Sequence, residues 1–355
     1  MTILQSRTSL DGSQTNLANR QHWGGQHVLI TGGNGFIGSH LTEKLVSMGA
    51  KVTVVDRGDC QVTPNLESVL DQIEYCQDEL TNVDCDELIA GHDYRAIFHF
   101  AGNATVPGSV ENPWEDFQMN LMVSLRLMES LRRSQRPTAL ILASSAAVYG
   151  DALVVPIGED APTAPISPYG VSKLAMDGYA SVYARLYGLR VGVLRPFAVY
   201  GPRLRKQVVY DFMRKLSVNP NRLEAHGDGT QLRDFCYVSD LVDAAVVIEA
   251  SGELRGEVYN IASGVGSSIR CVLDLLSSRL QVQPELYWSG FVRPGEPSRW
   301  IADISRIQAL GWQPKVSLEV GLDRTVEWFK CTTLSCPDGG VAPDDKAFNL
   351  SASIH

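Results

Sequence analysis

The chain has 355 residues, of which 44% are hydrophobic and 20% charged, proportions that exclude a disordered or fibrous protein. At roughly 150 residues per domain, this length predicts two lobes with a core that needs no disulfides. The 31 basic and 40 acidic residues give a net charge of -9, which repels nucleic-acid phosphates and anionic membranes. Seven scattered cysteines without a CxxC pair indicate a reduced, cytoplasmic protein.

The first 25 residues are polar and rich in Gln, Ser, Asn and Thr. They lack the roughly 7 to 15 consecutive apolar residues that a secretion signal needs, so we expect residues 1–25 to form a flexible arm. No apolar run approaches the roughly 18 residues of a membrane span. We therefore expect no membrane segment.

From Gln26 the chain repeats a short apolar run followed by a longer helical stretch. The runs do not alternate with polar residues, which is typical of parallel strands that helices cover on both faces. The pattern therefore predicts an α/β fold with a doubly wound parallel sheet of the Rossmann type. The predicted strands are residues 27–31, 51–56, 73–76, 96–100, 139–144 and 190–195.

After Gly201-Pro202 the strands and helices become less regularly spaced. Residues 239–261 again predict a helix and then a strand, so we expect the chain to return to the sheet. The larger domain is predicted over 26–200 plus 236–263, and a smaller, discontinuous α/β domain over 201–235 plus 264–330. Beyond Lys330 the chain is rich in Pro, Gly, Ser and Asp without apolar periodicity, which predicts a disordered tail over 331–355.

The first predicted strand runs into Thr31-Gly32-Gly33-Asn34-Gly35-Phe36-Ile37-Gly38, which opens a helix. Gly32 and Gly35 permit a tight turn and a close approach to a pyrophosphate, and Gly38 permits close packing of helix and strand. The helix N-terminus adds free N–H groups. A strand-to-helix turn that binds nothing is the alternative interpretation.

Two acidic residues follow the next strands. Asp56 ends the second strand, where a carboxylate accepts hydrogen bonds from an adenosine ribose and repels a 2'-phosphate. This position favours NAD over NADP, although the neighbouring Arg57 weakens the preference. Asp78 follows the third strand, where it is placed to meet the adenine or to be a solvated loop acid.

A Tyr–Lys pair lies in Tyr169-Gly170-Val171-Ser172-Lys173, at the start of a predicted long helix. Residues four apart share one helical face, so the ammonium lies near the phenol. A phenol with a pKa near 10 needs roughly 4 kcal/mol of stabilisation of its anion to act as a base near pH 7. Ser144 and Ser145 end a predicted strand at the ligand-binding edge of the sheet, or serve there only as caps.

Five ordered motifs, TGxxGxxG, SSxxVYG, YxxxK, LRPFxVYGPR and GDGxQxRDF, span residues 26–330. Together they resemble the extended short-chain dehydrogenase/reductase family, and within it the NAD-dependent nucleotide-sugar epimerases and dehydratases of the UDP-glucose 4-epimerase type. The resemblance implies that the larger domain binds NAD, that the smaller one binds a nucleotide sugar, and that Ser145, Tyr169 and Lys173 form the catalytic triad.

The same resemblance implies further site residues. The NAD site would comprise Gly32, Gly35, Phe36, Ile37, Gly38, Asp56, Asp78, Ala101, Gly102, Asn120, Tyr169 and Lys173. The substrate site would comprise Ser144, Ser145, Phe197, Arg233 and Arg293, with the two arginines gripping the diphosphate. His99 would also line the cofactor, or be a satisfied core residue. Two positions differ from many relatives: Ala198 replaces Asn, and Glu296 replaces Asp. No metal-ligand set is visible.

Two alanines separate the possible reactions. Ala146 and Ala147 stand where related dehydratases carry Asp-Glu, and related decarboxylases keep a Glu at the second position. Methyl groups transfer no protons, so the resemblance predicts an epimerase that inverts C4. A carboxylate from another loop, such as Glu111 or Glu159, would restore lyase chemistry. A dehydratase, decarboxylase or keto-reductase therefore stays the alternative, with a non-catalytic NAD-binding regulator a remote one.

The resemblance also implies a homodimer. The expected interface uses the helices around residues 113–133 and 169–187. The apolar residues there fit a protein core equally well: Met122, Leu125, Met128, Tyr179 and Tyr183.

Overall fold

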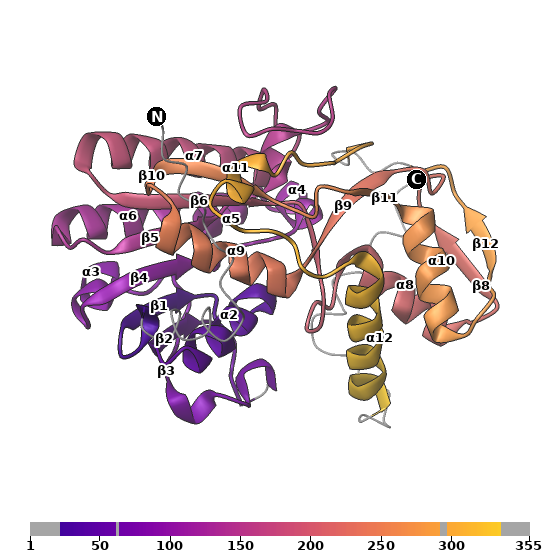
Figure 1. Cartoon of the computed structure of the whole chain (residues 1–355), viewed down its shortest axis with the longest axis horizontal. Coiled ribbons are helices and arrows are strands. Elements are labelled where there is room, and N and C mark those ends of the chain that lie inside the picture. The colour runs from indigo at the N-terminus through magenta and orange to yellow at the C-terminus, as the bar shows by residue number, and fades with distance from the viewer. Residues whose placement is uncertain (1–21, 62–63, 292–296, 335–355) are drawn as a thin grey trace, which may run out of the picture.

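Seven strands form one central sheet in the computed structural model, which describes residues 22–61, 64–291 and 297–334 (Figure 1). The strand order is β10-β6-β5-β4-β1-β2-β3, and every neighbouring pair is parallel. The strands are β1 (His27–Thr31), β2 (Lys51–Asp56), β3 (Ile73–Gln77), β4 (Tyr94–His99), β5 (Ala139–Ala143), β6 (Arg190–Pro196) and β10 (Arg255–Ile261). The predicted doubly wound α/β fold is confirmed, including the return of the chain to the sheet through β10.

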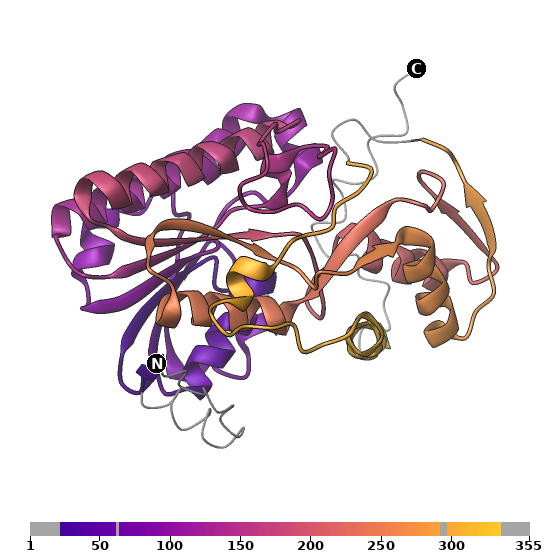
Figure 2. The same ribbon diagram turned by 45° about the horizontal axis from the view of Figure 1, so that its top comes forward.

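Helices cover both faces of this sheet, as the apolar runs predict. Leu29 and Ile97 face the layer made by α3 (Cys85–Ala90), α6 (Val123–Ser134) and α7 (Pro168–Tyr187). Val28 and Ile30 face the opposite layer, made by α2 (Phe36–Ser47) and α9 (Val238–Ser251). Figure 2 shows α7 lying along one side of the sheet and α9 along the other.

The direction of winding changes between β1 and β4. The chain passes from β1 outward to β2 and β3, then crosses back to β4 and continues to β5 and β6. The loops after β1 and β4 therefore leave the carboxyl edge on opposite sides and open a crevice, which is where sheets of this kind bind ligands.

A smaller group of elements lies at one end of the sheet (Figure 1). Its strands form two small sheets, ordered β11-β9-β7 and β12-β8. These strands are β7 (Ala198–Tyr200), β8 (Arg222–Ala225), β9 (Leu232–Tyr237), β11 (Gly266–Ser268) and β12 (Glu285–Trp288). The accompanying helices are α8 (Gln207–Val218), α10 (Ile269–Leu280) and α12 (Leu318–Leu334).

The remaining short elements lie on loops of the large sheet and its surroundings. They are α4 (Val106–Glu111), α5 (Pro113–Phe117), the π-helical turn η3 (Gln118–Met122), α11 (Ser305–Gln308), and the 3-10 turns η1 (Pro64–Leu66), η2 (Leu70–Gln72) and η4 (Ala146–Tyr149). In the described ranges no helix is long and apolar enough to cross a membrane. Nor do three or more metal-ligating side chains of those ranges converge on one point.

Both expected ends of the folded part need correction. His22 and Trp23 form a helical turn, and the Trp23 indole is fully buried against Phe98, so the arm predicted over 1–25 is wrong at its last residues. Helix α12 continues to Leu334, so the tail predicted from residue 331 is wrong at its first four positions. The rest of both segments, 1–21 and 335–355, lies outside the described residues.

Candidate active site

The glycine-rich turn joins β1 to α2 at the crevice. Gly32 has a φ of +73°, and a Cβ there would lie 2.6 Å from the backbone nitrogen of Ala101, so only glycine fits. A Cβ on Gly38 would collide with the carbonyl oxygen of Gly32, which confirms the close packing of helix and turn. Gly35 is the N-cap and no side chain caps the helix. The first-turn N–H groups therefore suit a phosphate.

Asp56 closes this turn from the end of β2. Its Oδ2 accepts a hydrogen bond from the Asn34 backbone N–H at 2.9 Å, and its Oδ1 accepts one from Gly58 N–H at 2.8 Å. These bonds fix the carboxylate beside the turn. The exposed Asp78 follows β3, and its backbone N–H donates to the Asp56 carbonyl at 3.0 Å. This backbone hydrogen bond places the two acids next to each other on the same side of the crevice.

The loop after β4 forms the opposite wall. Gly102 has a φ of +146°, and a Cβ there would lie 2.5 Å from Oδ1 of Asn120. That oxygen is buried without a hydrogen-bond partner, whereas Nδ2 of Asn120 donates to Oδ1 of Asp116 at 2.9 Å. Asn120 lies in the π-helical turn η3, an arrangement that often occurs at functional sites. The glycine turn, the ribose-side acid and this wall fit a dinucleotide.

His99 is a core residue. Its Nδ1 is 2.6 Å from the Thr31 hydroxyl and its Nε2 is 3.0 Å from the Ser124 hydroxyl, so both ring nitrogens are bonded. Burial, with a smaller contribution from the Lys173 charge, lowers its pKa to about 3. The imidazole is therefore neutral and structural, and the alternative of a satisfied core histidine holds.

Tyr169 and Lys173 lie in the first turns of α7, which begins at Pro168 behind the N-cap Ser167. Nζ of Lys173 donates a hydrogen bond to the Ala143 carbonyl at 2.8 Å, at the end of β5. It lies 5.8 Å from the centre of the Tyr169 ring. The helix and the carboxyl end of β5 therefore hold the ammonium over the phenol.

Ser145 follows β5 directly and caps η4, where its Oγ accepts a hydrogen bond from Ala147 N–H at 3.1 Å. A side-chain hydrogen bond with Ser145 acts to lower the pKa of Tyr169, against the effect of burial. The structure thus brings the three predicted triad residues together at the carboxyl edge of the sheet.

Burial dominates the titration of the pair. It raises the pKa of Tyr169 to about 12, and the carboxylates of Asp116 and Asp177 act in the same direction. Burial lowers the pKa of Lys173 to about 8, and the same two carboxylates oppose it. At neutral pH Lys173 is therefore charged and Tyr169 is protonated. A further positive charge next to the phenol would lower the pKa of Tyr169.

Of the predicted substrate residues, Ser144, Phe197 and Arg233 are buried. The Phe197 ring meets Trp300 edge-on at 6.1 Å, and the Arg233 guanidinium lies 6.0 Å over the same indole. Trp300 is anchored by its Nε1–H, which donates to the Gly150 carbonyl at 3.0 Å. Trp300 lies outside the five sequence motifs, so the sequence did not indicate a role for it at the site. Arg293 and Glu296 lie outside the described residues.

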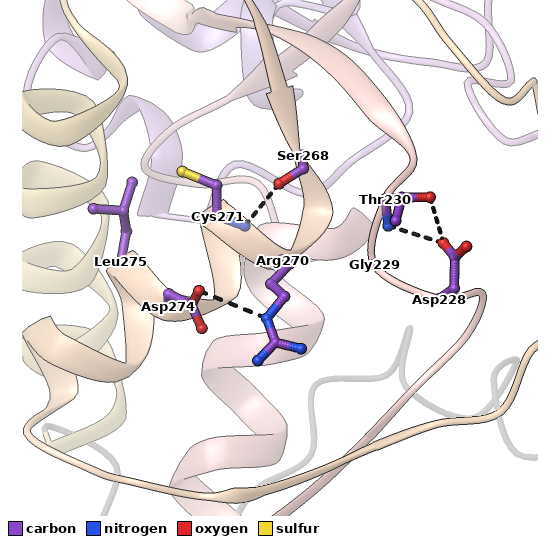
Figure 3. Close-up of a pocket in the computed structure, with 8 residues that line it drawn as sticks. All are labelled: Asp228, Gly229, Thr230, Ser268, Arg270, Cys271, Asp274 and Leu275. Atoms are coloured by element: carbon purple, nitrogen blue, oxygen red, sulfur yellow. Dashed lines mark hydrogen bonds and ion pairs between the residues drawn. The ribbon is translucent and has the colours of Figure 1, made fainter.

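The GDG loop that precedes Arg233 borders a separate open cavity of about 550 Å³ (Figure 3). Oδ1 of Asp228 accepts bonds from the Thr230 N–H and hydroxyl, which fixes this loop. Arg270 points along α10 toward Asp274. None of the predicted site residues lines this cavity, and we assign it no part in the reaction.

Comparison with known proteins identifies the class of this fold and site. The family model for the NAD dependent epimerase/dehydratase family matches residues 28–262. The chain belongs to this family, and NAD is its cofactor.

Individual relatives cover most of the chain. A putative UDP-glucose 4-epimerase of Methanocaldococcus jannaschii is 32% identical over 307 residues, which are 85% of this chain and 98% of that protein. The structure of UDP-glucose 4-epimerase from Thermotoga maritima with UDP-glucose has a TM-score of 0.80 and 33% identity, and the match covers 87% and 100% of the two chains. The complex of UDP-glucose 4-epimerase from Thermus thermophilus with NAD has a TM-score of 0.77 and 31% identity, covering 86% and 99%.

Proposed function

We propose that this chain is an NAD-dependent 4-epimerase of a nucleoside-diphosphate sugar. The observation that carries the proposal is the placement of Tyr169, Lys173 and Ser145 at the carboxyl edge of the sheet, followed by two residues that cannot act as an acid–base pair. Ala146 and Ala147, which follow Ser145, are both buried and transfer no protons. The triad alone supports oxidation and reduction at one carbon.

Tyr169 takes the proton of the sugar C4 hydroxyl, and Ser145 donates a hydrogen bond to the same oxygen. NAD, when bound, would supply the hydride acceptor and donor for C4, and the positive charge of its oxidised form would favour the phenolate. Lowering a pKa from about 12 to 7 needs about 7 kcal/mol of preferential stabilisation of the phenolate. The Lys173 ammonium contributes to this stabilisation, and turnover should therefore fall as the pH rises above about 8 and this charge is lost.

Inversion requires the transient 4-keto sugar to rotate within the site, so that its opposite face is reduced. Tyr169 then returns the proton to the oxygen. Atoms and electrons balance within one cycle, so no external reductant is needed.

We assign the NAD site to residues 26–200 plus 236–263. The residues that would hold the cofactor are Gly32, Gly35, Phe36, Ile37, Gly38, Asp56, Asp78, Ala101, Gly102, Asn120, Tyr169 and Lys173. The positive φ angles of Gly32 and Gly102 and the fixed Asp56 carboxylate support this assignment.

We assign the nucleotide-sugar site to residues 201–235 plus 264–330, with Ser144, Ser145 and Phe197 contributed from the sheet side. Arg233 would bind the diphosphate, because a guanidinium already oriented over Trp300 presents a fixed fork of donors. Arg293 is proposed for the same task. The curated relatives are named for UDP sugars, so UDP-glucose and its C4 epimer are the first substrates to test.

A lyase reaction would require a carboxylate at the sugar. Glu159 is committed elsewhere: it is buried, its Oε1 accepts from Asn260 N–H at 2.9 Å, and its Oε2 is 3.7 Å from Arg306. Glu111 is exposed at the end of α4. These placements favour the epimerase over a dehydratase or decarboxylase.

The cellular setting and assembly are also proposals. We infer a cytoplasmic protein, because five cysteines spread over the chain are free thiols: Cys60, Cys76, Cys85, Cys236 and Cys271. We infer a homodimer through α5, α6 and α7. Of the apolar residues named for that interface, Met128 and Tyr183 pack in the core, whereas Tyr179 is exposed on α7.

The deciding experiment uses UDP-glucose deuterated at C4, with the products followed by NMR. We expect UDP-galactose that carries deuterium at C4, without lasting NADH. Release of water or carbon dioxide from the sugar, or a stable keto product, would overturn the epimerase assignment. A panel of UDP and other nucleotide sugars in the same assay identifies the preferred base and sugar.

A further inference from the structure

A buried arginine, Arg195, follows the apolar residues 191–194 in strand β6. Its side chain is only 6% exposed, and burial of a guanidinium is costly unless it is paired. Nε of Arg195 donates to Oδ2 of Asp177 at 2.8 Å, and Nη1 donates to the Tyr149 hydroxyl at 2.8 Å. The guanidinium also lies 4.9 Å over the Tyr149 ring. Arg195 therefore joins two elements that carry triad residues.

The first of these elements is α7. Asp177 lies one helical turn after Lys173, and both side chains are buried. Oδ1 of Asp177 is buried without a hydrogen-bond partner. Burial raises the pKa of the Asp177 carboxyl, and the paired Arg195 guanidinium and the Lys173 ammonium oppose this rise. The pair with Arg195 at 2.8 Å thus favours the carboxylate form of Asp177 one helical turn from Lys173.

The second element is η4, which Ser145 opens and Tyr149 ends. The Tyr149 hydroxyl donates to Oδ1 of Asn260 at 2.7 Å. Asn260 lies in β10, and its Nδ2 donates to the Ile157 carbonyl at 2.9 Å. The serine turn is thereby fixed to the same guanidinium as the Tyr–Lys helix.

We propose that Asp177, through its pair with Arg195, is a positioning residue that keeps the Lys173 ammonium charged and in place beside Tyr169. The expected change in kcat rests on the proposed function. The expected change in the titration of Lys173 and Tyr169 does not depend on any sugar substrate.

The charged and titratable groups that face Lys173 come from several elements. Tyr169 and Asp177 lie on its own helix, Asp116 on α5, the neutral His99 on β4, and Arg195 on β6 behind Asp177. Asp177 and Asp116 raise the pKa of Lys173, and both also raise the pKa of Tyr169. Removing the Asp177 charge therefore moves both titrations to lower pH.

The test compares Asp177→Asn with Asp177→Glu in the NAD-loaded protein. For Asp177→Asn we expect kcat to fall by about 10²-fold at neutral pH with little change in KM, and both limbs of the kcat profile to move to lower pH. Asp177→Glu restores a carboxylate and should recover much of the loss. The matched control is Asp323→Asn, which breaks an ion pair between Asp323 on α12 and Arg279 on α10. It should leave the pH profile of kcat unchanged.

Two further measurements keep the proposal testable. If Asp177→Asn does not fold because Arg195 is left unpaired, the double variant Asp177→Asn/Arg195→Gln removes both buried charges. It should show the same shift, because Asp177 is the group of the pair that acts on Lys173.

The second measurement is ultraviolet titration of the Tyr169 phenolate, taken as the difference between each protein and its Tyr169→Phe form. Its midpoint should lie at lower pH in the Asp177→Asn background. A wild-type chain that converts no nucleotide sugar would refute the proposed function. The titration of Tyr169 would still test the role of Asp177, because it needs no substrate. Unshifted profiles and an unshifted titration would refute the role of Asp177.

Discussion

Nζ of Lys173 donates a hydrogen bond to the Ala143 carbonyl at 2.8 Å and lies 5.8 Å from the centre of the Tyr169 ring. The carbonyl at the end of β5 thus holds the charge in place without neutralising it. The same burial that makes this charge effective near the phenol lowers the pKa of Lys173 to about 8.

This burial has a measurable effect on stability. In the unfolded chain a lysine titrates near pH 10.4, whereas the folded value is about 8. Between these values the unfolded state binds more protons, so the contribution of Lys173 to the free energy of unfolding rises with pH, by about 3 kcal/mol in total. Urea unfolding from pH 7 to 9.5 should show this rise in wild type relative to Lys173→Met. The exposed Lys315→Met serves as control, and a pH-independent difference for Lys173→Met would contradict the burial of a charged lysine.

Tyr169→Phe removes the hydroxyl and keeps the ring that packs at the start of α7. Turnover should fall by about 10² to 10⁴-fold, the range for loss of a general acid–base group. The affinity for the nucleotide sugar should change little, which calorimetry with UDP-glucose measures. A Phe variant with near-native turnover would show that another residue is the base.

Asp56 predicts the cofactor preference. Both of its oxygens are fixed by backbone N–H groups, which leaves the carboxylate oriented at the end of β2. Wild type should bind NAD more tightly than NADP, and Asp56→Asn should weaken NAD binding by about 10-fold or more, the value of a hydrogen bond to a charged group. Titration of each cofactor into stripped protein checks this, with the exposed Asp71→Asn as control. Tighter binding of NADP by wild type would refute the assignment.

Much of the sheet could be predicted because its central strands are aliphatic runs buried on both faces. Val28 to Ile30 and Leu140 to Leu142 carry that signal without help from other segments. The proposed triad could be predicted because Tyr169 and Lys173 keep a fixed spacing within one helix and Ser145 follows a strand directly, so local sequence positions all three.

What the sequence missed depends on contacts between distant segments. Arg195 follows an apolar run in β6 and Asp177 resembles any acid on a helix, so only the fold reveals their pair. Trp23 follows a polar stretch, and one aromatic residue has no periodicity. Its partners, Phe98 and the Arg95 guanidinium 5.3 Å away, come from β4.

Trp23 gives a prediction about the N-terminal segment. Its indole is fully buried beneath the sheet, so Trp23→Ala should lower the free energy of unfolding by about 3–5 kcal/mol, the cost of a large cavity. Urea denaturation measures this change. Tyr287→Ala on β12, where the ring is 56% exposed, should change stability by no more than about 0.5 kcal/mol. Equal effects of the two substitutions would show that the docking of Trp23 is not maintained in solution.

The last prediction concerns assembly. Several apolar side chains on α4, α5 and α7 are exposed in the single chain, namely Val110, Trp114, Tyr179, Leu186 and Tyr187. An exposed apolar surface of this kind is typical of an interface, and α5 and α7 lie where the homodimer is expected. Light scattering at micromolar concentration should give twice the 38.9 kDa chain mass. Leu186→Glu places a charge in the proposed interface and should yield the monomer, because an unpaired carboxylate is costly to bury. Val218→Glu, on the exposed end of α8, should remain dimeric. A wild-type monomer would refute the dimer, and a dimeric Leu186→Glu would place the interface elsewhere.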